Sequence, residues 1–155
     1  MELARRLYAD RPVDLAAVLS DRTMLDAMRS QLEPLVHPDF EAVFEDRGMP
    51  MGAASIEKTA TDERNPTVYG FDGLVSTWRE WLSAWDTWVV TPNRFVEVDQ
   101  ERVLVLMDVR ALSKTHQVEM PVEGANLLTI RDGKLSRLEL FLDQSEAFKA
   151  AGLSE

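Results

Sequence analysis

The chain has 155 residues, no cysteine, and a net charge of −10 from 17 basic and 27 acidic side chains. An acidic surface repels nucleic-acid phosphates and anionic lipids, so we expect neither nucleic acid nor a membrane as a partner. Without cysteine, disulfides and thiolate metal sites are excluded. No run approaches the ~20 apolar residues of a membrane span. The first residues also lack the apolar stretch of a secretory signal, so we expect one cytoplasmic domain over residues 1–155.

Three helical segments are predicted in the N-terminal part, residues 1–36. The first covers residues 3–8, the second follows Asp14, and the third covers residues 24–35 with Asp21 or Thr23 as its N-cap. Apolar residues recur along the third segment at the spacing of one helix face. We therefore expect these helices to pack on a sheet formed by the rest of the chain.

The middle of the chain contains a long polar stretch between two short strands. Residues 40–44 and Val68–Tyr69 have strand character, and residues 45–66 between them have no clear period. A stretch of this length inside a compact domain is usually functional, so we interpret residues 45–66 as a lid loop that carries Met49 and Met51.

A tryptophan-rich helix is predicted next, from about Gly73 to Trp85, with Asp72 as its cap. Trp78, Trp81 and Trp85 follow the i, i+3, i+7 spacing of a buried helix face. One of these indoles, Trp78 or Trp85, is our candidate for stacking on a planar ligand.

From Trp88 onward the pattern changes to the alternation of strands. Strands are predicted at residues 88–91 with 95–98, 102–111, 117–131 and 134–143, before a last helix from Gln144 or Ser145 to Gly152. Helices first and a meandering sheet afterwards indicate an α+β fold.

The turn around Asp132-Gly133 decides which side chains face the interior. A three-residue loop with a glycine bulge places Leu138, Leu140 and Leu142 beside Asn126, whereas a two-residue loop places Arg137, Glu139 and Phe141 there. We favour the first arrangement, because burying an unpaired charge costs several kcal/mol.

Several stretches of this chain resemble one known group of proteins. They are Gly70-Phe71-Asp72-Gly73 before the tryptophan-rich helix, Val103–Leu106, Leu128–Lys134, Glu146–Leu153, and His37-Pro38-Asp39 ahead of the first strand. Over residues 37–153 the chain is similar to the SnoaL-like branch of the nuclear transport factor 2-like superfamily. The resemblance implies a curved antiparallel sheet forming a cone-shaped open barrel around a pocket, packed on N-terminal helices, with a short C-terminal helix. Members include ketosteroid isomerase-like enzymes, polyketide cyclases, epoxide hydrolases and non-catalytic binding modules.

We expect an apolar pocket inside the cone with few polar groups. Tyr8 and Tyr69 could add hydroxyl donors to its rim or wall. The predicted lining is Phe44, Tyr69, Trp78, Trp85, Met107, Met120, Asn126, Leu128, Leu138 and Leu140.

The resemblance makes Asn126 the one candidate for catalysis. It falls where ketosteroid isomerase keeps a protonated aspartic acid, and an amide can donate the same hydrogen bond. Phe44 stands near the position of that enzyme's catalytic base and cannot accept a proton, so the isomerase reaction is not expected.

Other catalytic sites of the superfamily have little support in the residues. Asp108 and Arg110 share a strand face and could contribute to the Asp-Arg-Asp site of the superfamily's epoxide hydrolases, but strand alternation points both of them outward. His37 and His116 do not have the spacing of metal ligands, and we expect no metal and no cofactor.

Three functions are compatible with these residues. The leading one is a SnoaL-like protein that binds a small hydrophobic molecule. The alternatives are an isomerase, cyclase or hydrolase of a hydrophobic polycyclic or terpenoid-like substrate, and a non-catalytic interaction module. In all three cases we expect a homodimer formed through the outer sheet face, on which we place Leu127, Leu135, Arg137, Glu139 and Phe141.

Overall fold

The computed structural model describes residues 2–8, 12–44, 67–83, 85–115, 117 and 119–153. The proposed lid, residues 45–66, lies outside the described residues, as do His116 and the side chains of Phe44 and Trp81. The elements in chain order are α1 Glu2–Leu7, β1 Val13–Asp14, α2 Leu15–Ser20, α3 Arg22–Leu32, the 3-10 turn Glu33–Leu35, β2 Val36–Phe44, β3 Thr67–Tyr69, α5 Gly70–Leu82, β4 Trp85–Glu97, β5 Arg102–Ser113, β6 Glu119–Arg131, β7 Lys134–Phe141 and α6 Gln144–Ala151.

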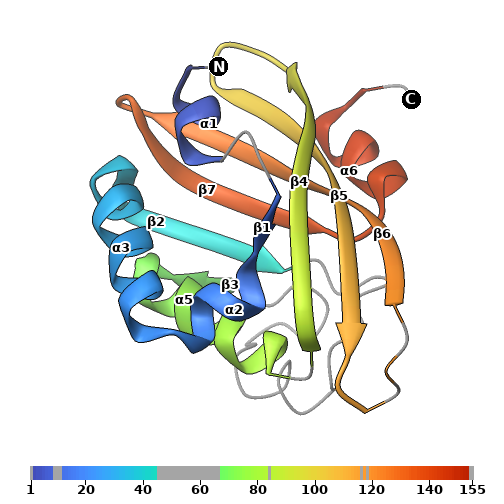
Figure 1. Ribbon diagram of the computed structural model, residues 1–155. Helices are drawn as coiled ribbons and strands as arrows, with labels where there is room; N and C mark the ends of the chain where they lie inside the picture. Colours follow the sequence, from blue (N-terminus) through green and yellow to red (C-terminus); the bar gives the residue numbers. More distant parts are fainter. Residues whose placement is uncertain are drawn as a thin grey trace.

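The strands form one curved sheet in the order β1-β4-β5-β6-β7-β2-β3 (Figure 1). Its two outermost strands do not pair with each other, so the barrel is open. All neighbouring strands are antiparallel except β2 and β7, which run parallel. The expected α+β cone is confirmed, with a mixed rather than a purely antiparallel sheet. Helices α2, α3 and α5 lie on one side of the sheet and α6 lies on the other.

The helix starts follow from local side-chain caps. Asp14 accepts hydrogen bonds from the backbone N–H groups of Ala16 and Ala17 at the start of α2. Asp21 accepts one from Met24 at the start of α3, so the cap is Asp21 rather than Thr23. Such caps satisfy backbone donors that have no partner within the helix.

The hairpin between β6 and β7 places the expected face inward, but through a two-residue turn and a bulge rather than a three-residue loop. The turn has only two residues, Asp132 and Gly133, both with positive φ. Ser136 is then an extra residue in β7, because Ile130 pairs with Leu135 but Thr129 pairs with Arg137. A bulge of this kind exchanges the faces of a strand. As a result Leu140 pairs with Asn126, as we predicted, although the loop length we assigned was wrong.

Trp85 lies on a strand, so our prediction that the helix reaches it was wrong. Helix α5 ends at Leu82, and Trp85 is the first residue of β4. A bulge at Asp86 puts Trp85 and Trp88 on one face, where their rings meet edge to face with centroids 5.2 Å apart. A bulged strand thereby reproduces the i, i+3 spacing of a helix.

The two faces of the sheet have separate apolar cores. The inner core lies between the sheet and helices α2, α3 and α5. The outer core lies under α6, where Leu127 and Phe141 are buried together with Ala147 and Ala151. Leu127 and Phe141, two of the residues that we assigned to the outer sheet face, are thus covered by α6. Leu135 belongs to the inner core, so its assignment to the outer face was wrong.

Candidate functional site

A cavity of about 480 Å³ lies between the inner face of the sheet and the N-terminal helical segments. Most of its wall is apolar, and α1, α2, α3, α5 and the inner face of the sheet contribute to it. The apolar lining residues are Leu7, Val13, Leu15, Val18, Met24, Ala27, Met28, Leu32, Val36, Phe40, Phe71, Leu74, Trp78, Val90, Pro92, Met107, Leu135, Leu138 and Leu140. A wall of this composition favours an apolar ligand, because burial of apolar surface drives binding.

The polar part of the wall contains a hydrogen-bonded pair. Asn126 is 7% exposed and lies in the middle of β6, and its Nδ2 donates a 2.6 Å hydrogen bond to the Tyr8 hydroxyl. Tyr8 follows α1 and packs edge to face on Phe95, with ring centroids 6.2 Å apart. The Tyr8 oxygen accepts this hydrogen bond, but the Tyr8 O–H group donates no hydrogen bond to any described residue. It can therefore donate to an oxygen of a ligand.

Tyr8 stays a neutral phenol over the whole physiological range. Burial raises the pKa of Tyr8 to about 12, and the hydrogen bond from Asn126 offsets only part of that rise. A phenol with this pKa donates a hydrogen bond but does not act as a base near pH 7.

No carboxylate and no imidazole is found among the described lining residues. Besides Tyr8 and Asn126, the polar lining residues are Arg6 and Gln31. Glu41 and Glu139 lie on the opposite face of the sheet, where both bond to Arg137 at 2.5 Å and 3.0 Å. The described wall thus offers hydrogen-bond donors and a cation, but no general base.

The structure brings half of the predicted lining together. Trp78, Met107, Asn126, Leu138 and Leu140 all line the cavity. They come from α5 and three neighbouring strands, and Asn126 and Leu140 are direct partners across the hairpin.

Four predicted lining residues lie elsewhere. Tyr69 is 72% exposed, because Val68 takes the inward position of the three-residue strand β3. Met120 is 40% exposed near the start of β6, where it pairs with Ala111. Leu128 and Trp85 are buried in the inner core but do not border the cavity.

Three polar lining residues come from segments whose sequence pattern gives little indication of a site. Arg6 and Tyr8 lie at the end of the N-terminal helix, and Gln31 lies near the end of α3. The sequence indicates Tyr8 as a candidate for the rim or wall, but no pattern in it indicates Arg6 or Gln31. The helix pattern could have indicated that α1 packs inward, but not that it would reach Asn126.

The residues considered for other catalytic sites have structural partners. Asp108 and Arg110 are exposed, as predicted, and bond to Asn93 and Glu119 respectively. In the part of the chain that the structure describes, no group of histidine and acidic side chains is arranged to hold a metal ion.

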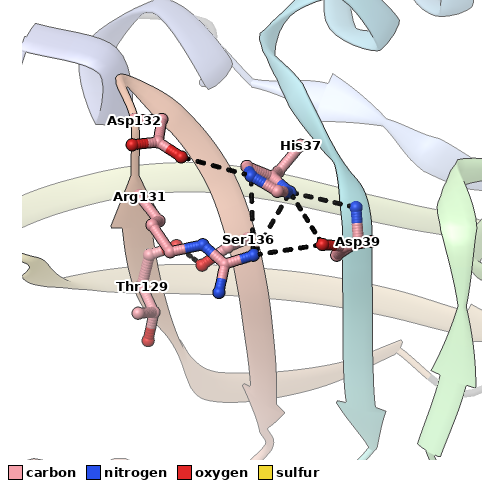
Figure 2. Close-up of polar contacts among 6 residues, drawn as sticks. All are labelled: His37, Asp39, Thr129, Arg131, Asp132 and Ser136. Carbon is pink, nitrogen blue, oxygen red and sulfur yellow. Dashed lines mark hydrogen bonds and ion pairs between the residues drawn. The ribbon is translucent and has the colours of Figure 1, made fainter.

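His37 joins the start of β2 to the tip of the β6–β7 hairpin (Figure 2). Its side chain is 13% exposed, and its Nδ1 accepts a 3.0 Å hydrogen bond from the backbone N–H of Asp39. Asp132 lies 3.5 Å from its Nε2, and the Arg131 guanidinium lies 3.5 Å from the ring. His37 does not line the cavity, so its contacts indicate a structural role.

Comparison with solved structures identifies the fold. A putative SnoaL-like polyketide cyclase from a Jannaschia species has a TM-score of 0.62 at 13% identity, with 99% of this chain and 92% of that chain covered. A nuclear transport factor 2-like protein of unknown function from Burkholderia pseudomallei has a TM-score of 0.59 at 16% identity, covering 87% and 93%. This chain has the nuclear transport factor 2-like fold.

A third structure with this fold is TerC, co-crystallised with polyporic acid. It has a TM-score of 0.57 at 20% identity, with 89% of this chain and 96% of TerC covered. No family model matches the sequence. No curated protein matches it either. The nuclear transport factor 2-like fold places the cavity inside its cone, but the reaction or ligand has to be argued from the residues.

Among the described residues, no helix combines the length and the apolar character that a membrane span requires.

Proposed function

We propose that this protein binds a small hydrophobic molecule that carries an acceptor oxygen. The observation that supports the proposal best is the composition of the cavity, which is apolar except for a few polar groups. Its volume of about 480 Å³ lies within the range of ~300–1,000 Å³ of small-molecule sites. A cone filled by its own side chains would not leave such a space.

The Tyr8–Asn126 pair would orient the ligand. A carbonyl or ether oxygen placed beside the Tyr8 hydroxyl would accept its hydrogen bond, and the apolar body would contact Met107, Leu138 and Leu140. Losing such a bond leaves a buried donor without a partner, which costs ~1–3 kcal/mol. TerC, which shares the fold, was crystallised with an organic compound, and this supports a small organic ligand here.

A second candidate function is an enzyme that polarises a carbonyl group. The same pair favours it, because a neutral phenol and an amide can stabilise a developing oxyanion. Proton transfer would also need a base, and the described wall offers none. Binding is therefore the function that we place first.

The homodimer is also a proposal. Arg137, Glu139 and Glu41 form a partly exposed charged group on the outer face, beside the area that α6 covers. Polar groups next to apolar surface are typical of an interface rim.

Two naphthalenes of matched size test the binding proposal. 2-Acetylnaphthalene has an acceptor oxygen and 2-ethylnaphthalene has none, so isothermal calorimetry on the wild-type protein separates apolar burial from hydrogen bonding. We expect both compounds to bind and the ketone to bind about tenfold more tightly, which corresponds to ~1.4 kcal/mol. The preference should disappear in Tyr8→Phe. Failure of both compounds to bind would overturn the proposal.

A further inference from the structure

We infer that the cavity takes an organic anion, a molecule with an apolar body and one carboxylate or comparable acidic group, and that Arg6 at its wall binds the acidic group. This ligand class presupposes the proposed function, because it concerns the same cavity.

The charge of the cavity wall differs from that of the chain as a whole. Acidic residues outnumber basic ones by 27 to 17 in the sequence. Among the described lining residues, however, the one charged side chain is that of Arg6, and no aspartate or glutamate joins it. The wall of an acidic protein thus carries a local positive charge.

Arg6 has no competing partner within the described part of the chain. Its side chain is exposed, and it makes no ion pair or hydrogen bond to another described residue. The neighbouring Arg5 is engaged, since its guanidinium lies over the Phe95 ring, 4.7 Å from the ring centroid. Arg5 does not line the cavity. Of the two adjacent arginines, only Arg6 is placed to meet a ligand.

A guanidinium at the edge of an apolar cavity suits an amphiphilic acid. Arginine presents a planar set of donors that matches a carboxylate with two parallel hydrogen bonds. Because Arg6 is exposed, its charge and that of the ligand keep part of their hydration, so the desolvation cost stays low. The apolar body would occupy the interior, where burial favours it.

The test compares 2-naphthylacetic acid with its methyl ester, which has the same ring system without the charge. Dissociation constants are measured by calorimetry at pH 7.5 in 50 mM and 500 mM NaCl, for wild type, Arg6→Gln and the matched control Arg5→Gln. We expect the acid to bind the wild type about fivefold more tightly than the ester at low salt, as an exposed ion pair allows. The preference should shrink at high salt and be absent in Arg6→Gln, but persist in Arg5→Gln.

The outcomes separate the two proposals. If acid and ester bind the wild type equally, or if Arg6→Gln keeps the preference, the anion assignment is wrong while the binding function stands. If neither compound binds, both proposals are overturned. Since the net charge of −10 repels an acid, a preference for the acid would point to a local cation rather than to the protein's overall field.

Discussion

Asn126 and Tyr8 lie 118 positions apart in the chain and are joined by a 2.6 Å hydrogen bond at the cavity wall. The bond connects the segment after α1 with the central strand β6, and it places a phenol donor where a ligand would lie. The N-terminal helix therefore supplies part of the site as well as covering the sheet.

The energy of this contact can be measured with a double-mutant cycle. Tyr8→Phe and Asn126→Leu each remove one partner, and the double variant removes both. We expect a coupling energy of ~1 kcal/mol in the free energy of unfolding, measured with urea, because a partly buried neutral hydrogen bond contributes about that amount. Additive effects of the two substitutions would show that the side chains do not interact.

Alkaline titration tests the burial of Tyr8. Its pKa of about 12 in the folded protein lies above the ordinary value of 10. The unfolded chain therefore loses the phenol proton first as pH rises, and stability should fall between about pH 10 and pH 12. Absorbance at 295 nm should show a phenol step near pH 12 in the wild type, provided the protein is still folded there.

The control for that titration is Tyr8→Phe, in which Tyr69 is the remaining tyrosine. This variant should lack the late step and lose less stability above pH 10 than the wild type. A wild-type titration curve without the late step, and therefore the same as that of Tyr8→Phe above pH 11, would contradict the buried environment of Tyr8.

The pattern of charged and apolar residues predicts which face of the β6–β7 hairpin is buried, but not the bulge that sets this face. The cost of burying charge was enough to place Leu138 and Leu140 inside and Arg137 outside. The extra residue Ser136, whose hydroxyl donates to the Thr129 carbonyl oxygen at 3.1 Å, had no signal in the sequence. The order of apolar and charged residues along β7 determines which face is buried, because burying a charge is costly. The length of the turn and the position of the bulge depend instead on local backbone contacts.

Arg137 is expected to stabilise the parallel pair of strands β2 and β7. Burial lowers the pKa of Arg137, but its hydrogen bonds to Glu139 and Glu41 outweigh burial and raise it. Arg137→Met leaves these two carboxylates without their shared cation, and we expect a loss of ~1–2 kcal/mol in urea unfolding. Arg110→Met removes an exposed pair with Glu119 and should cost less than ~0.5 kcal/mol. Equal effects would mean that the outer-face group contributes no more than a surface pair.

Two glycine substitutions should change stability in opposite directions. Gly133 has φ of +73° in the two-residue turn and open space around it, so Gly133→Ala should cost ~1 kcal/mol through backbone strain alone. Gly73 lies inside α5, and a Cβ there would make an ordinary 3.5 Å contact with Val68, so Gly73→Ala should gain up to ~1 kcal/mol. Thermal unfolding of both variants checks this, and a stabilised Gly133→Ala would contradict the turn.

The site was predictable from the sequence where side chains follow the regular spacing of a strand or a helix, as Trp78 does on α5. Met107, Asn126, Leu138 and Leu140 lie on regular parts of their strands, and all four line the cavity. Trp85 was misplaced because it follows Trp78 and Trp81 at helical spacing, although α5 ends at Leu82 and Trp85 begins β4. Arg6 and Tyr8 reach the cavity through tertiary contacts that have no local signature.

Binding of a hydrophobic molecule requires a cavity that is open and apolar next to Asn126. Leu140 pairs with Asn126, so Leu140→Trp should place an indole over the amide and fill part of the space. Met120→Trp is the control, because Met120 is 40% exposed and lies outside the cavity lining. The deciding measurement is the calorimetric dissociation constant of 2-acetylnaphthalene for the wild type and both variants. We predict at least tenfold weaker binding for Leu140→Trp and unchanged binding for Met120→Trp, whereas unchanged binding in Leu140→Trp would contradict the account.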